Sequence, residues 1–277
     1  ASAFVGQVEA QIMIRPYLSG MTMSELLASM TGSMACIAGG VMAVYISMGV
    51  PASYLLAASL MAAPGALVIS KIVFPETQES ETKGVVKIEV KKEQTNIMDA
   101  ISHGASDGMA ISINVIAMLI GVIALVALVD ALLGYFGLFL GWTGLSLDFM
   151  GLDVNNLRLK DVFGAFFSLF AIVMGVPVAE SFDVGSLMGT KMVINEFVAY
   201  SDLTPMIHAG TLSPKSIVIA SFALCGFANF SSIAIQLGGI GAMVPSRKAD
   251  LARLGFKAMI CGTMASYISA SLAGILM

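Results

Sequence analysis

One apolar run of this sequence has its polar residues in a central band instead of along one side. Residues 219–236 read IASFALCGFANFSSIAIQ, and the polar and small residues lie between Cys225 and Ser232. A helix on the surface of a soluble protein would place its polar residues along one stripe. At the middle of a bilayer, polar groups are costly unless they meet a partner or a substrate. The band therefore predicts a helix that crosses a membrane and breaks at its centre, as at the binding sites of secondary transporters.

The composition supports a membrane protein and excludes several other classes. Of the 277 residues, 57% are hydrophobic and 12% are charged, whereas about a quarter of the residues of a soluble domain are charged. The net charge of -4 is small and scattered, which argues against a nucleic-acid partner. Cys36, Cys225 and Cys261 lie inside apolar runs without CxxC spacing, so neither a disulfide nor a metal centre is expected.

The apolar segments form a series that occurs twice. Residues 1–17 are too short to cross a bilayer, which takes about 20 residues, and we interpret them as the second arm of a re-entrant hairpin. An interrupted span follows at 24–48, and a further span at 54–74. We expect residues 1–74 to be the first repeat of a longer protein, with its N-terminal spans missing from this sequence.

A polar linker and a long span come next. Residues 75–98 contain many lysines and glutamates and are expected to form a cytoplasmic linker. Residues 99–140 are expected to hold an interfacial amphipathic helix, starting near residue 96 and ending near 112, and then a long scaffold span over 114–136. Residues 141–161 are expected to form a periplasmic loop.

Residues 162–277 repeat the order of hairpin, broken span and span. The second hairpin is expected to have its arms at 162–174 and 179–200, around a turn at 175–177. The broken span and the last span are expected at 214–243 and 251–277. The single long crossing between the two copies places the second upside down relative to the first, and the excess of Lys and Arg on one side assigns that side to the cytoplasm. The predicted fold class is thus an all-α polytopic membrane protein with an inverted repeat of re-entrant hairpin, broken transmembrane helix and transmembrane helix.

Each predicted hairpin contains one carboxylate in apolar surroundings, Glu9 in the first and Glu196 in the second. Either could simply close the fold through a polar contact, but two at matching places, each next to an amide, favour a function. Carboxylates and amides suit a neutral solute with many hydrogen-bonding groups, such as a nucleoside or a sugar. Phe227 could cover an aromatic ring or pack between helices. Asp130 could serve transport or form a polar contact between protomers or helices.

Three motifs, in this order along the chain, resemble those of the concentrative nucleoside transporters. They are GQVEA at 6–10 with RPY at 15–17, NEFVAY at 195–200, and CGFANFSSI at 225–233. The resemblance implies an ion-coupled nucleoside symporter of the inner membrane, homotrimeric and working by alternating access. It implies no enzymatic activity and no cofactor other than a coupling ion, H+ or Na+.

The resemblance also implies roles for single residues. The nucleobase-binding positions of the family correspond to Gln7, Val8 and Glu9, with Val8 where Thr or Ser is usual. The ribose-binding positions correspond to Glu196, Phe227, Asn229 and Ser232. The family's sodium site corresponds to Ser2, Val5, Cys36 and Ile37.

The coupling ion stays open at this point. Members with a clear sodium site have Asn and Ser where this chain has Ser2 and Cys36. A thiol is a poor ligand for a hard cation, so proton coupling through Glu9 or Glu196 is the competing hypothesis. The sequence does not distinguish a purine from a pyrimidine preference.

Two other functions remain as alternatives. Another re-entrant-hairpin transporter, for carboxylates or other solutes, would need a buried Arg beside the Asn and Ser cluster, and the sequence has none there. A gate or sensor with the same repeat but no transport activity is also compatible with the pattern. An intramembrane enzyme would need a carboxylate dyad, a Ser-His pair or a metal-ligand cluster at one depth, and the sequence suggests none.

Overall fold

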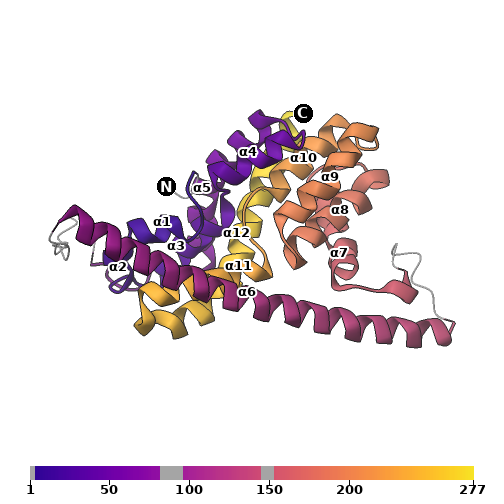
Figure 1. Cartoon of the computed structure of the whole chain (residues 1–277). Helices are drawn as coiled ribbons and strands as arrows, with labels where there is room; N and C mark the ends of the chain where they lie inside the picture. The colour runs from indigo at the N-terminus through magenta and orange to yellow at the C-terminus, as the bar shows by residue number, and fades with distance from the viewer. Residues whose placement is uncertain (1–3, 82–95, 145–152) are drawn as a thin grey trace.

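The computed structural model describes residues 4–81, 96–144 and 153–277, and every regular element within these ranges is a helix (Figure 1). Within these ranges, the helical segments long and apolar enough to cross a membrane are Met23–Ser47, which is interrupted, Ala52–Val73, Ile97–Trp142 and Pro245–Leu276. The chain is therefore an all-α membrane protein, as the sequence predicted.

The region predicted to be the first repeat begins with short helices and a broken span. Its helices are α1 (Glu9–Met13), α2 (Arg15–Leu18), α3 (Met23–Ala35), α4 (Gly39–Ser47) and α5 (Ala52–Val73). At the start of α3 the Thr22 hydroxyl accepts a hydrogen bond from the Glu25 N–H, and the Glu25 carboxylate accepts one from the Thr22 N–H. This pair of bonds fixes where α3 begins. The predicted interruption of the first broken span is confirmed, since Cys36 and Ala38 have extended backbone between α3 and α4.

One long helix, α6 (Ile97–Trp142), replaces the two elements predicted for residues 99–140. The prediction of a separate interfacial helix was wrong, because Asn96 caps the helix through the Asp99 N–H and nothing interrupts its 46 residues. Figure 1 shows α6 along one side of the molecule, where it packs against α11. Most of the predicted cytoplasmic linker, and residues 145–152 of the predicted periplasmic loop, lie outside the described residues.

The second hairpin differs from its prediction in one respect. Two helices, α7 (Leu159–Val173) and α8 (Val178–Val193), pack closely on either side of the expected turn, where Gly175 has a positive φ of 102°. The expected second arm, 179–200, is not a single helix: α8 ends at Val193, and α9 (Glu196–Ala209) begins after Ile194 and Asn195. Asn195 has extended backbone, and its side chain accepts a hydrogen bond from the Val198 N–H, so it starts a new helix.

The second broken span is confirmed. It consists of α10 (Pro214–Leu224) and α11 (Phe230–Met243), and the chain ends with η3 (Pro245–Arg247) and α12 (Lys248–Leu276). Gly226, between α10 and α11, has a φ of 99°, and a Cβ atom there would lie 2.4 Å from the Ala35 carbonyl oxygen. The two interruptions therefore touch each other, and α12 packs against α3, α5, α10 and α11 to hold them in the interior.

Candidate functional site

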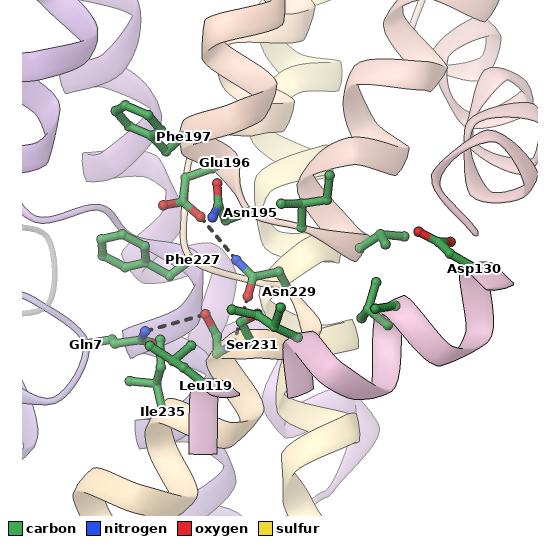
Figure 2. Close-up of a pocket in the computed structure, with 16 residues that line it drawn as sticks. Gln7, Leu119, Asp130, Asn195, Glu196, Phe197, Phe227, Asn229, Ser231 and Ile235 are labelled. Atoms are coloured by element: carbon green, nitrogen blue, oxygen red, sulfur yellow. Dashed lines mark hydrogen bonds between the residues drawn. The ribbon is translucent and has the colours of Figure 1, made fainter. Parts of the chain in front are cut away.

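The interruptions of the helices bring polar side chains from distant parts of the sequence to one cavity. Its volume is about 520 Å³, and it is bounded by the loop before α1, the start of α9, the loop before α11 and one face of α6 (Figure 2). The lining residues are Gln7, Leu119, Ile123, Val126, Ala127, Asp130, Val193, Ile194, Asn195, Glu196, Phe197, Phe227, Asn229, Ser231, Ser232 and Ile235. All four predicted ribose-binding residues are among them.

Asn229 connects the start of α11 to the start of α9. Its Oδ1 atom accepts a hydrogen bond of 2.8 Å from the Ser232 N–H, which is the ordinary N-cap interaction. Its Nδ2 atom donates a hydrogen bond of 3.1 Å to Glu196 Oε2 (Figure 2). One amide therefore both caps a helix and orients the buried carboxylate.

Glu196 is the first residue of α9, and only 5% of it is exposed. A carboxylate at this position gains from the positive end of the helix dipole. Besides the bond from Asn229, it accepts a hydrogen bond of 3.2 Å at Oε1 from the Tyr45 hydroxyl. The Tyr45 ring packs on Tyr200, with 4.3 Å between the ring centroids.

Tyr45 was not predicted as a site residue. It lies on α4 among apolar residues and is fully buried, and buried tyrosine hydroxyls usually have a partner. That rule indicated a polar partner inside the fold, but it did not identify Glu196. The contact joins α4 to the start of α9.

Gln7 approaches the same group from the first hairpin. Its Nε2 atom donates a hydrogen bond of 3.4 Å to the Ser232 hydroxyl (Figure 2). Its Oε1 atom is buried and has no hydrogen-bond partner among the described residues. A buried acceptor without a partner is costly, and this one belongs to a residue that lines the cavity.

Glu9 and Val8 occupy a different position from the one expected. Glu9 is exposed and lines a neighbouring cavity of about 440 Å³, which Val8 also lines. Val8 is itself buried, with its methyl groups over Gly239. The two cavities share a wall formed by Gln7, Phe227 and Ile235. The two hairpin glutamates therefore lie on opposite sides of this wall, whereas a single common cavity was expected.

The residues of the expected cation site partly come together. Ser2 lies outside the described residues. The Phe4 carbonyl accepts a hydrogen bond of 2.9 Å from the Gly39 N–H, which ties the residues around Val5 to the interruption between α3 and α4. Cys36 and Ile37 are buried there, and the Cys36 thiol lies 3.7 Å from the Ser59 carbonyl oxygen. Among the described residues of this expected site, the oxygen atoms available to a cation are thus backbone carbonyls, and the Cys36 thiol has another partner.

One further polar residue of the cavity, Asp130, has a structural contact. Asp130 Oδ1 accepts a hydrogen bond of 2.8 Å from the Leu159 N–H, which fastens the start of α7 to α6. Of the two possibilities considered for Asp130, the structure supports a helix contact, although the residue also lines the cavity. The described residues contain no group of three or more His, Cys, Asp or Glu side chains that could hold a metal ion.

The known proteins that this chain resembles are transporters. A family model described as "Na+ dependent nucleoside transporter C-terminus" matches residues 54–274. The chain is 45% identical, over 99% of its length, to the uncharacterized transporter YutK of Bacillus subtilis, and 40% identical, again over 99%, to sodium/nucleoside cotransporter 2 of Rattus norvegicus. It spans 65% of the first relative and 42% of the second, less than two thirds of either.

Solved structures of the protein CNTnw have the same fold. A variant in an outward-facing state matches all of this chain and 64% of its own, with 43% identity and a TM-score of 0.86. CNTnw in an inward-facing, substrate-bound state matches with a TM-score of 0.76 and 44% identity, covering 99% of this chain and 62% of that one.

Proposed function

We propose that this chain, which belongs to the concentrative nucleoside transporter family, forms the substrate-binding part of a nucleoside importer. This family consists of transporters and not of enzymes. The observation that favours a bound nucleoside is the buried Gln7 Oε1 acceptor beside the Glu196–Asn229 pair, in a cavity of about 520 Å³.

The polar residues of the cavity suit the two halves of a nucleoside. The Glu196 carboxylate accepts hydrogen bonds, so vicinal ribose hydroxyls can donate to it, while Asn229 and Ser232 supply further donors and acceptors. Gln7 lies at the shared wall of the two cavities, and its free oxygen can accept an N–H of the base. We assign Glu196, Phe227, Asn229 and Ser232 to the ribose, and Gln7, Val8 and Glu9 to the nucleobase.

The position of Glu9 adds a condition to this assignment. A base that reaches Glu9 must extend past Gln7 and Phe227 into the neighbouring cavity. The Phe227 ring lies at the boundary and could stack on the base as it passes. The separation of Glu9 from Glu196 thus suits a two-part ligand and disfavours a single sugar.

Transport by alternating access is the corresponding mechanism. In broken-helix transporters the elements around the interruptions move against a scaffold while the substrate stays between them. We propose that the domains are a first repeat at 1–74 and a second at 162–277, joined by the scaffold helix α6, in an inner-membrane homotrimer.

The coupling ion is proposed separately. A sodium ion at the interruption between α3 and α4 would bind to carbonyl oxygens, including those of Val5 and Ile37, because the Cys36 thiol faces Ser59. Oxygen ligands suit sodium, so weak sodium coupling through the backbone is one proposal. Proton coupling through Glu9 or Glu196 is the other.

Uptake into membrane vesicles tests both nucleoside transport and the identity of the coupling ion. Vesicles containing the full-length protein are given labelled uridine or adenosine with a sodium gradient, a pH gradient, or neither. Concentrative uptake of either nucleoside supports the function, and the gradient that drives it identifies the ion. Absence of uptake under every condition, with the protein present in the membrane, would favour a gate or sensor instead.

A further inference from the structure

A lysine side chain occupies the interior of the fold and does not line the cavity that contains Glu196. Lys191, on α8, is only 2% exposed. Its ammonium group donates hydrogen bonds of 2.8 Å to the Ala223 carbonyl oxygen and 3.1 Å to the Cys225 carbonyl oxygen. A buried ammonium is costly unless polar groups surround it, so these contacts must be strong enough to keep it there.

The two carbonyls belong to the point where α10 stops. The last carbonyls of a helix have no partner within it, and together they form the negative end of the helix dipole. Other side chains satisfy the remaining groups there: the Ser266 hydroxyl donates to the Cys225 carbonyl at 2.7 Å, and the Tyr200 hydroxyl to the Ser221 carbonyl at 2.7 Å. A carbonyl-lined end of a half-helix is an arrangement that binds monovalent cations in transporters.

We propose that Lys191 is a tethered cation, which permanently fills a carbonyl-lined cation site in the second broken span. Removing its side chain would open that site to a free monovalent cation. The inference gives Lys191 a positioning role within the proposed transporter: it holds the interruption open so that Asn229 can reach Glu196.

The first broken span provides the contrast. Its α3 helix also ends before a cysteine with extended backbone, at ψ 166° for Cys36 against 134° for Cys225. Among the described residues, no Lys or Arg donates a hydrogen bond to a carbonyl at the end of α3. The two interruptions therefore have similar backbone, but only the second has its own cation. A free coupling cation would have a place at the first interruption and not at the second.

Variants of Lys191, measured with small cations in solution as probes, test the proposed cation site. In the full-length protein without nucleoside, Lys191→Ala leaves a space, Lys191→Met fills it with apolar atoms, and Lys248→Ala changes an exposed lysine as a control. Thermal unfolding is followed in choline chloride, sodium chloride and methylammonium chloride at equal ionic strength. We expect both Lys191 variants to unfold at least about 5 °C below wild type in choline. Methylammonium or sodium should restore most of the difference in Lys191→Ala only.

The outcomes separate cleanly. If Lys191→Ala shows the same salt response as wild type and Lys191→Met, the carbonyls do not form a cation site and the inference is wrong. If Lys191→Ala is folded only in methylammonium or sodium, it is supported. If Lys191→Ala does not fold in any of the three salts, the unfolding temperature of Lys191→Gln decides. The Gln side chain is an uncharged donor, so an unfolding temperature equal to that of wild type would show that no cation is needed. The readout requires no transport, so a failure of nucleoside uptake would leave it unaffected.

Discussion

The Asn229 amide donates a hydrogen bond of 3.1 Å to Glu196 and at the same time caps α11 through the Ser232 N–H. Asp would cap α11 equally well, but it would place a second carboxylate against Glu196. We therefore expect Asn229→Asp to keep the wild-type unfolding temperature to within a few degrees while nucleoside uptake falls by roughly tenfold or more at neutral pH. Uptake should partly recover as the pH falls, because one of two adjacent carboxylates then binds a proton. Unchanged uptake at neutral pH would show that the pair is not part of the binding site.

Tyr45 supplies the other hydrogen bond to Glu196. Tyr45→Phe removes only the hydroxyl and retains the ring packing on Tyr200. A hydrogen bond to a charged group contributes about 1.5–3 kcal/mol, so we expect nucleoside affinity to fall about tenfold, with little change in expression. Affinity is measured by equilibrium binding of labelled uridine and adenosine. Tyr135→Phe, at an exposed position on α6, is the matched control and should bind as wild type does.

The contact between the two interruptions depends on a glycine. Gly226→Ala would combine an unfavourable positive φ with a Cβ atom 2.4 Å from the Ala35 carbonyl oxygen. We expect a loss of about 3 kcal/mol or more in the free energy of unfolding, read as a lower unfolding temperature. Gly121→Ala, on α6 with open space around the new Cβ, should be neutral or stabilising. Equal stability of the two variants would contradict the described packing.

A hydrogen-bonded carboxylate outside the spans provides a pH-dependent test. Glu76 accepts a hydrogen bond of 2.7 Å from the Thr22 hydroxyl and one of 3.1 Å from the Gln78 N–H, with Lys71 3.4 Å away. The Thr22 hydroxyl is the main cause that holds the pKa of Glu76 below its ordinary value of 4.5. A carboxylate with a lowered pKa stabilises the folded state above its unfolded pKa, and this contribution is lost as the pH falls through the lowered value.

Glu76→Gln should therefore unfold at a slightly lower temperature than wild type at neutral pH. The difference should correspond to less than about 1 kcal/mol, because Glu76 is largely solvated. It should disappear well below pH 4.5. Unfolding temperatures of both proteins across this pH range check the prediction, and a difference that persists unchanged in acid would contradict it.

Local chemistry explains which parts of the fold could be predicted. Both broken spans were predicted because small residues interrupt apolar runs, and in the second span an amide adds to the signal, as at Gly226 and Asn229. The break at Ile194–Asn195 was missed because neither residue is a glycine or proline; Asn195 acts as a helix cap, which the apolar pattern does not reveal. The continuity of α6 was also missed, since its polar first third resembles an interfacial helix although the backbone never stops.

The residues of the candidate site could be predicted in part, but their relative positions could not. Glu196, Asn229 and Ser232 were predicted, and they line one cavity. The placement of Glu9 beyond Gln7 and Phe227, and the contact of Tyr45 with Glu196, depend on how distant parts of the chain pack together. No spacing within either predicted repeat determines these distances. Which side of the wall each half of a nucleoside occupies stays a prediction.

Equilibrium binding to a Glu196 variant is the most direct test of the account. Labelled uridine and adenosine are titrated into the purified full-length protein, into Glu196→Gln, and into Glu79→Gln as an exposed control. We predict that wild type and Glu79→Gln bind at least one of the two nucleosides alike. Glu196→Gln should bind it roughly 10- to 100-fold more weakly, because the charged acceptor for the ribose is lost. Wild-type affinity in Glu196→Gln would contradict the proposed site.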